Sequence, residues 1–176
     1  VTAMIRIGNQ KGLNDYVTLR RVAISIFLLT IIIEVVFALL FVVLHTSLPY
    51  IFADINDVKN LTENLEVIAI SANLLLVAAV FQISDGLQVV VLGALRGLQD
   101  AKIPMYITFV AYWVIGFPIS IYLGLETELK AVGVWIGLLA GLTAAAIFLY
   151  IRFNYLTKKL VQVQTNPEAS GQVQLQ

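Results

Sequence analysis

The sequence predicts an all-α membrane protein, folded as a bundle of transmembrane helices. Of its 176 residues 60% are hydrophobic and 12% are charged, whereas soluble domains are about 45–50% apolar and about 25% charged. A soluble core cannot hold this excess, because a domain of this length must still cover a large surface. Four apolar stretches are also long enough, at about 20 residues, to cross a bilayer as helices. Their hydrophobicity is continuous rather than alternating, which favours helices over barrel strands.

The first residues indicate the end of an earlier helix. Residues 1–16 are expected to hold that helix end, closed by Gly8, and then a polar cytoplasmic loop. The first complete span follows at 22–44, where Glu34 is the only charged residue. Since the sequence enters in mid-helix, we expect the chain to be part of a longer protein.

Three further spans are predicted at 67–95, 103–124 and 131–151, so that residues 17–153 form the part of the chain embedded in the membrane. After the last span, residues 154–176 are rich in Gln and lack apolar periodicity. This composition is typical of a disordered segment, and we expect a disordered cytoplasmic tail there.

The last predicted span carries Gly133, Gly137 and Gly141, each four residues from the next. Small residues at this spacing lie on one face of a helix and let two helix backbones approach closely in lipid. We expect these glycines to support packing within the bundle, with dimerisation through the same face as the alternative.

Basic residues are distributed unequally between the two sides of the predicted bundle. Lys59 and Lys130 fall on one side, and the other nine of the 11 Lys and Arg residues fall on the opposite side. Cytoplasmic loops carry an excess of Lys and Arg, so the richer side is predicted to be cytoplasmic, together with the C-terminus. The nine residues are Arg6, Lys11, Arg20, Arg21, Arg96, Lys102, Arg152, Lys158 and Lys159.

Asp85 lies deep in the second span and is the leading candidate for a functional residue. A charge near the bilayer centre costs roughly 2.5–3.5 kcal/mol or more, and such residues usually serve ion or substrate pathways. Phe81 and Gln88 share its helix face, and Gln82 lies beside it. A carboxylate among amides suits a site where H⁺ or Na⁺ is held and released. The alternative is a structural Asp that bonds a neighbouring helix.

Four residues are candidates for a substrate cavity. Tyr112 and Trp113 lie too deep in the third span to be interfacial anchors, and with Phe81 they offer aromatic faces to flat, cationic compounds. Glu34 either faces the same cavity, pairs with another helix, or is a lone packing residue that stays protonated. Packing inside the bundle is the alternative for the aromatic residues.

Pro118 lies inside the third span, two residues after Gly116. Proline removes one backbone hydrogen bond and clashes with the preceding turn, so the helix is expected to kink there. Gly116 and Pro118 are therefore a candidate conformational hinge.

Several classes of function lack the residues that they require. The sequence contains no Cys and only one His, His45, so thiolate chemistry and clustered Cys or His metal ligands are excluded. It contains no nucleotide-binding loop and no nucleophile motif, so we predict neither an enzyme nor an ATP-driven pump. No cofactor is expected apart from a coupling H⁺ or Na⁺, and no nucleic acid is expected as a partner.

Four segments follow one another in a characteristic order. They are RIGNQKG at 6–12, QISDGLQVVVLGALRGLQDAKIP at 82–104, YWVIGFP at 112–118 and GVWIG at 133–137. In this order they resemble the loop after the eighth helix, the tenth-helix signature, and the two last helices of the MATE (multidrug and toxic compound extrusion) transporters. The resemblance covers residues 6 to about 153 and is closest to the NorM-like branch.

The resemblance implies a twelve-helix transporter of two six-helix lobes, in which this chain supplies the end of the eighth helix and helices nine to twelve of the C-terminal lobe. In the NorM-like branch the aspartate at the position of Asp85 belongs to a cation site, which implies the same role here. Two departures affect that site. Phe81 stands where the branch often has Tyr, and the glutamate of the seventh helix that completes the site lies outside this sequence.

The function implied by the resemblance is multidrug efflux by antiport of H⁺ or Na⁺ through alternating access. It implies small cationic or amphipathic drugs as substrates, the bacterial inner membrane as location, and the N-terminal part of the transporter as partner. One alternative is a flippase for lipid-linked oligosaccharides, which would need a cationic cavity, although no Lys or Arg lies deep in these spans. The other is a non-transporting membrane scaffold, which would gain nothing from Asp85.

Overall fold

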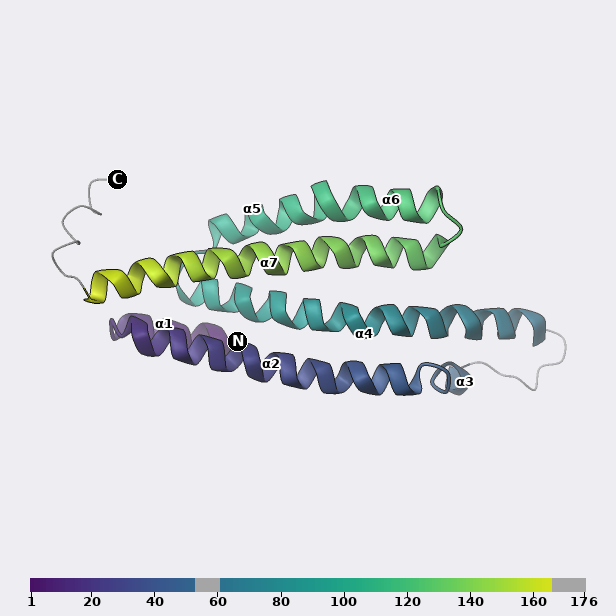
Figure 1. Ribbon diagram of the computed structural model, residues 1–176, viewed down its shortest axis with the longest axis horizontal. Coiled ribbons are helices and arrows are strands. Elements are labelled where there is room, and N and C mark those ends of the chain that lie inside the picture. Colours follow the sequence, from purple (N-terminus) through teal and green to yellow (C-terminus); the bar gives the residue numbers. More distant parts are fainter. Residues whose placement is uncertain (53–60, 166–176) are drawn as a thin grey trace.

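The computed structural model describes residues 1–52 and 61–165. Every regular element in these residues is a helix, which confirms the predicted fold class (Figure 1). A single π-helical turn, η1, connects α5 to α6 within one continuous segment. In chain order the elements are α1 (Thr2–Gly12), α2 (Tyr16–Leu44), α3 (Pro49–Phe52), α4 (Leu61–Gly97), α5 (Lys102–Val110), η1 (Ala111–Gly116), α6 (Phe117–Leu125) and α7 (Lys130–Thr165).

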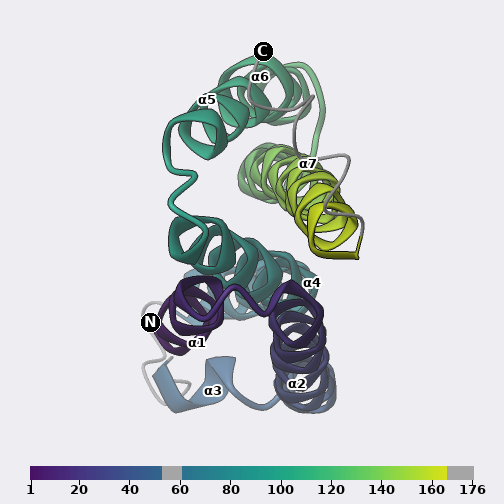
Figure 2. The ribbon, with the colours of Figure 1, turned by 90° about the vertical axis from the view of Figure 1, so that its left-hand side faces the viewer.

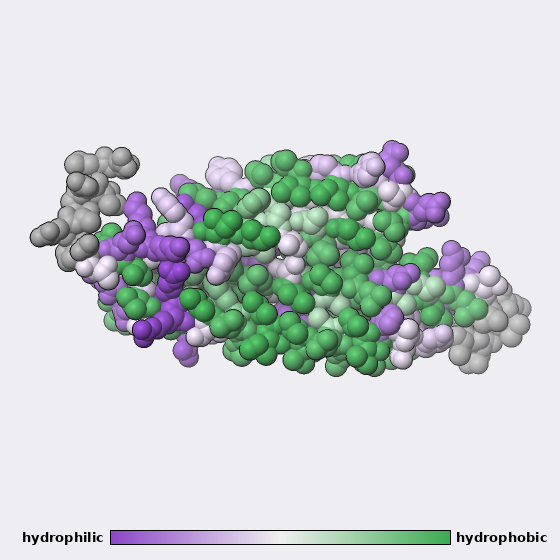
Figure 3. Space-filling model, in the orientation of Figure 1, coloured by the Kyte–Doolittle hydropathy of each residue, from purple (hydrophilic) through white to green (hydrophobic). Residues whose placement is uncertain are grey.

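Four helical segments in the described part of the chain are long and apolar enough to cross a membrane. They are Tyr16–Leu44, Thr62–Gly97, Lys102–Leu125 and Lys130–Thr165, and each contains one of the spans predicted from the sequence. Apolar side chains cover the middle of the bundle, while hydrophilic residues gather towards its two ends (Figure 3). This distribution is that of a multi-pass membrane protein.

The helix α4 lies at the centre of the bundle. It packs against α1 and α2 and also against α7, while α7 packs against α6 and η1. Figure 1 shows α2, α4 and α7 running side by side, and Figure 2, along the bundle axis, shows α5 and α6 on the side opposite α2. Residues of α4 therefore face three different neighbours.

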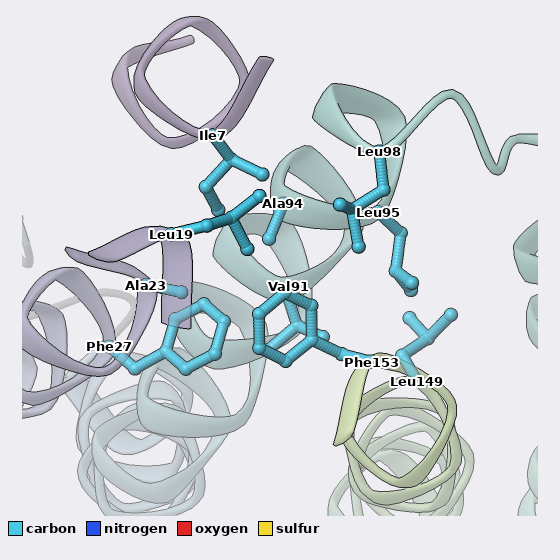
Figure 4. Close-up of a cluster of buried hydrophobic side chains, with 10 residues drawn as sticks. All are labelled: Ile7, Leu19, Ala23, Phe27, Val91, Ala94, Leu95, Leu98, Leu149 and Phe153. Atoms are coloured by element: carbon cyan, nitrogen blue, oxygen red, sulfur yellow. The ribbon is translucent and has the colours of Figure 1, made fainter. Parts of the chain in front are cut away.

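A cluster of buried apolar side chains joins α1, α2, α4 and α7 (Figure 4). Phe27 of α2 and Phe153 of α7 meet edge to face, with ring centroids 5.2 Å apart. The side chains of Val91 and Leu95 of α4 are fully buried in the same cluster. The complete set is Ile7, Leu19, Ala23, Phe27, Val91, Ala94, Leu95, Leu98, Leu149 and Phe153.

The nine basic residues singled out in the sequence lie at the same end of the bundle as this cluster. They belong to α1, the start of α2, the connection from α4 to α5, and the C-terminal part of α7. We call this the basic end of the bundle. Lys130 lies at the start of α7, at the opposite end, and Lys59 lies outside the described residues.

The structure corrects the predicted end of the first helix. Gly8 does not close it, because α1 continues for another turn. At the crossing with α4 it is Gly97 that needs to lack a side chain: a Cβ built there would lie 2.7 Å from the carbonyl oxygen of Met4 and 3.2 Å from the nitrogen of Gly8, whereas one on Gly8 would make an ordinary contact at 3.6 Å. The extra turn also brings Lys11 to the end of α4, where its Nζ donates to the carbonyl of Leu98 at 2.8 Å.

The prediction of a disordered tail is wrong for residues 154–165, which continue α7 to its end. Thr157 is buried, with only 1% of its surface exposed. Gln164 Oε1 accepts a hydrogen bond from the backbone N–H of Tyr16 at 2.9 Å. Packing on the start of α2 thus supplies the stabilisation that the polar composition of this segment does not indicate. Residues 166–176 lie outside the described residues.

The three glycines of α7 pack within the bundle, as predicted. An added Cβ at Gly137 would overlap the backbone of Ser120, and one at Gly141 would lie 2.8 Å from the Cα of Gly116. An added Cβ at Gly133 would overlap the backbone at the end of α6. This face of α7 is therefore occupied by η1 and α6 of the same chain.

Asp15 begins α2 as its N-cap. Its carboxylate accepts the backbone N–H of Thr18 at 3.0 Å and so satisfies one of the free donors of the first turn. The pKa of the Asp15 carboxyl is below its ordinary value of 3.8. The main cause is the hydrogen bond from the Thr18 side chain, and the hydrogen bond from the Thr18 backbone and the charge of Arg21 add to it.

Replacing Gly137 by Ala should destabilise the protein by about 1–3 kcal/mol, because the new methyl group has no space beside the backbone of α6. Gly12→Ala is the matched control, since a Cβ there would meet no atom within 4 Å. Thermal unfolding of the purified protein in detergent measures both effects. Equal midpoints for the two variants would contradict the packing role.

The cap of α2 predicts a specific dependence on pH. A carboxyl whose pKa is lowered by folding stabilises the folded state at any pH above its ordinary, unfolded-state pKa. This stabilisation is lost as the pH falls through the lower pKa of the folded state. Asp15→Ala should therefore lower the thermal midpoint at neutral pH, and the difference from wild type should shrink below pH 3.8. A difference that does not change with pH would show that the charge of Asp15 contributes nothing.

Candidate functional site

Asp85 lies on an uncovered face of α4, deep in the span. It is about 18 Å from the helix end at Gly97, at a rise of 1.5 Å per residue. Its side chain is exposed on the surface of the chain and makes no hydrogen bond or ion pair with residues 1–52 or 61–165. Its neighbours one turn away on the same face are Phe81 and Val89, so it is a carboxylate in apolar surroundings.

A buried polar pair lies beside this carboxylate. Tyr112 of η1 donates its hydroxyl hydrogen to Gln88 Oε1 at 3.0 Å. Gln88 is only 7% exposed, so this bond satisfies an oxygen that would otherwise be costly to bury. Asp85 precedes Gln88 by three residues on the same helix, but its side chain is exposed whereas that of Gln88 is buried.

Gln82 faces another neighbour. Its Nε2 donates to the backbone carbonyl of Glu34 in α2 at 3.1 Å. The Glu34 side chain lies against Gly86 of α4, where an added Cβ would be 2.8 Å from the Glu34 Cδ. Glu34 therefore packs on the α2 side of α4, against the residue that follows Asp85.

Ser84, the third polar side chain of this region, contacts α7. Ser84 Oγ lies 3.0 Å from Thr143 Oγ1 of α7. The polar side chains around Asp85 are thus shared among α2, η1 and α7. The structure brings Asp85 and Gln88 together, as the helix spacing predicts, and turns Gln82 towards α2. The described residues contain no group of three His, Cys, Asp or Glu side chains that could hold a metal ion.

The four residues predicted to line a substrate cavity do not share one pocket. Tyr112 and Trp113 line an open pocket of about 480 Å³, to which Arg96 also contributes. Phe81 instead meets Trp135 of α7 edge to face, with ring centroids 5.5 Å apart. Glu34 lies on the α2 side of α4, as described above. Trp113 is also part of a row of rings, with Phe109 at 5.8 Å and Phe117 at 5.4 Å.

The candidate hinge residues lie at an irregular part of the third span. The π-helical turn η1 ends at Gly116, directly before the first turn of α6, which contains Pro118. Wider turns of this kind are frequent at functional sites and accommodate a residue that cannot take part in the regular hydrogen-bond pattern. Gly116 is also buried, facing Gly141.

Two contacts of this region are not indicated by the sequence pattern. Trp135 lies between Gly133 and Gly137, on a different face of α7 from these glycines, and there it contacts Phe81. Arg152 Nε donates to Asp100 Oδ2 at 2.9 Å and so joins α7 to the connection between α4 and α5. Nothing in the sequence spacing indicates this pair, since the two residues are 52 positions apart and Asp100 lies outside the spans.

Comparisons with known proteins agree with this architecture. A family model described as MatE matches residues 1–122. Three curated relatives are each named probable multidrug resistance protein NorM. The one from Rhodopseudomonas palustris is 38% identical over 158 residues, which are 90% of this chain and 32% of that protein. The proteins from Xylella fastidiosa and Deinococcus radiodurans are both 36% identical, over 89% and 88% of this chain and 31% and 33% of their own lengths. The chain thus spans about a third of the length of these relatives.

Breaking the bond between Tyr112 and Gln88 should destabilise the bundle. Tyr112→Phe leaves the Gln88 oxygen without its donor, and in a double-mutant cycle with Gln88→Leu the coupling should be about 0.6–1.7 kcal/mol, the range known for bonds between transmembrane helices. Tyr122→Phe is the matched control, since Tyr122 is 63% exposed. Chemical denaturation in detergent measures all variants, and additive effects in the cycle would argue against the bond.

Proposed function

Because the chain belongs to the MatE family, we propose that it forms the C-terminal part of a transporter that exports several drug-like compounds in exchange for a cation. The relatives named multidrug resistance proteins support this assignment. Such a protein moves its substrate without changing it chemically, so it is not an enzyme. The activity belongs to the whole transporter, and this chain contributes the helices described above.

The proposal rests on the position of Asp85 within a membrane span. A charge in a membrane span is expensive and is retained where it serves an ion or substrate pathway. Asp85 has no partner among the described residues, so a structural ion pair within this part of the chain does not account for it. We assign it the binding of the coupling cation, on the face of α4 that the other helices of this chain leave uncovered.

Tyr112 and Gln88 support the same site. The hydroxyl of Tyr112 bonds Gln88, which follows Asp85 by three residues on α4. In the proposed site it would supply an oxygen from the next span, since position 81 holds Phe rather than Tyr. A proton needs only the carboxylate, whereas Na⁺ needs several oxygen ligands, so Na⁺ would require further oxygens beyond these. Both ions remain candidates, and Gln82 would take part only by turning away from Glu34.

The aromatic residues on either side of Asp85 are the proposed contacts for substrate. Phe81 and Trp135 form one pair, and Tyr112 and Trp113 line the neighbouring pocket. Aromatic faces attract cationic and amphipathic compounds through cation–π contact. Glu34 would contribute a second negative charge from the side of α4 that faces α2, where it packs on Gly86 next to Asp85.

The transport cycle is proposed to follow alternating access in a bacterial inner membrane. Binding of cation at Asp85 and of drug in the cavity would disfavour each other, which couples their opposite movements. The segment α5–η1–α6, with Gly116 and Pro118 as hinge, is the candidate moving element. The excess of basic residues supports a cytoplasmic location for the basic end, and with it for the C-terminus.

The test is ethidium efflux from cells that carry the protein at its full native length, either wild type or Asp85→Asn. The variant should reduce efflux to background, because an amide cannot bind and release the coupling cation. Efflux by wild type should also stop when the proton gradient is collapsed or when Na⁺ is withdrawn, and the effective condition identifies the ion.

Glu126→Gln serves as the matched control, since this exposed carboxylate lies between α6 and α7, away from Asp85. Unchanged efflux in Asp85→Asn would refute the assigned role of this residue. Absence of any efflux in a well-expressed wild type would instead favour the flippase or the scaffold alternative.

A further inference from the structure

Glu34 is a second carboxylate within a membrane span, on the helix next to that of Asp85. It lies about 15 Å from the end of α2 at Leu44, at a rise of 1.5 Å per residue. Its side chain is half-buried, and its carboxyl forms no hydrogen bond or ion pair with residues 1–52 or 61–165. A charge at such a depth is costly and usually serves an ion or substrate pathway.

The Glu34 carboxyl lies directly against the backbone of α4. A Cβ built on Gly86 would be 2.8 Å from the Glu34 Cδ and 2.9 Å from its Cγ, so a residue larger than glycine would displace the carboxyl. Gln82, one turn earlier on α4, donates its Nε2 hydrogen to the backbone carbonyl of Glu34 at 3.1 Å. Both contacts are internal to the bundle and together fix where the carboxyl lies along α4.

This contact brings two carboxylates close together. Gly86 directly follows Asp85, and consecutive Cα atoms are 3.8 Å apart. Adding the reach of the two side chains from these Cα atoms places the carboxyl carbons of Glu34 and Asp85 within about 11 Å of each other. Two negative charges at this distance in apolar surroundings repel each other, and a cation bound by one is attracted by both.

The helices packed against α2 bring no positive charge to this level. They are α1, α4 and α7. Helix α1 carries Arg6, which lies beside the first turns of α2, roughly 15 Å before Glu34. Helix α7 contributes Tyr150, whose ring meets that of Phe27 about 10 Å before Glu34. Among the described side chains, the charged group closest to Glu34 along these helices is therefore Asp85 of α4.

We propose that Glu34 is the second carboxylate of the coupling-cation site, an inference that rests on the function proposed above. Its charge strengthens the binding of H⁺ or Na⁺ at Asp85, by roughly tenfold in affinity at this separation. Gly86 is a positioning residue, because its missing side chain lets the Glu34 carboxyl reach this place. A direct contact of Glu34 with substrate would instead change the affinity for the drug.

The experiment measures ethidium efflux from cells that carry the protein at its full native length, wild type or Glu34→Gln, at varied external pH and Na⁺ concentration. If H⁺ couples, the pH of half-maximal efflux should fall by about 1 unit, and if Na⁺ couples, its half-maximal concentration should rise roughly tenfold. The KM for ethidium at saturating cation should not change. Glu126→Gln, which removes an exposed carboxylate between α6 and α7, should behave like wild type.

Gly86→Ala tests the geometry while both carboxylates are retained. It should weaken the cation dependence of wild type but add no further loss to Glu34→Gln, because the group that it displaces then carries no charge. Gly93→Ala is the matched control on the same helix, since a Cβ there would make an ordinary contact with Ala3 Cβ at 3.8 Å. Thermal midpoints of the purified variants in detergent show whether each one folds.

The outcomes separate this role of Glu34 from the proposed function. Unchanged cation dependence in Glu34→Gln, a change in the ethidium KM alone, or fully additive effects of Gly86→Ala and Glu34→Gln would each overturn the role of Glu34 and leave that of Asp85 intact. Wild-type efflux that depends on neither cation would refute the proposed function, and the role of Glu34 with it.

Discussion

Backbone contact at glycine positions is the interaction on which the arrangement of this bundle depends. Lipid tails are as apolar as the helix surfaces, so association in a membrane relies on close van der Waals packing rather than on the exclusion of water. Gly97 lets α1 cross α4 closely, and Gly137 does the same for α7 and α6. The helices α4 and α7 pack against each other directly, through the buried cluster that contains Val91 and Phe153. The positions of the polar side chains on α4 follow from that arrangement.

The central helix distributes its polar side chains among its neighbours and leaves one without a partner. Gln82 bonds α2, Ser84 contacts Thr143 of α7, and Gln88 accepts a bond from Tyr112. Each bond helps to set the rotation of α4 about its axis. It also satisfies polar groups that could not form hydrogen bonds with lipid tails. Asp85 lies between these directions and faces outward from the chain. Of these four neighbouring polar side chains, Asp85 is the one without a hydrogen-bond partner among residues 1–52 and 61–165, and the proposed cation site rests on that position.

The apolar runs predict the helices because lipid allows few other backbone conformations, and the depth of Asp85 follows directly from its place in such a run. The ends of the helices could not be predicted in the same way. Gly8 resembles a helix stop in the sequence, whereas it lies inside α1, at the point where Gly97 of α4 approaches closely. Residues 154–165 look disordered by composition, yet they are helical because α2 supports them. Two other contacts depend on how separate spans are rotated relative to each other: Tyr112 with Gln88, and Glu34 with Gly86. The spacing of residues along one helix carries no information about that rotation.

The length of α7 has a mechanical consequence. This single helix is held near its start by the glycine contacts with α6 and η1, and near its end by Phe153, Arg152 and Gln164. From Gly141 to Thr165 it extends about 36 Å at 1.5 Å per residue, well beyond the thickness needed for half a bilayer. A tilt of about 10° around the glycine contacts would therefore move Thr165 by about 6 Å, from the same geometry. Because Phe153 and Gln164 contact α2 and Arg152 pairs with Asp100, such a tilt would have to break these contacts or carry α2 and the connection from α4 to α5 with it.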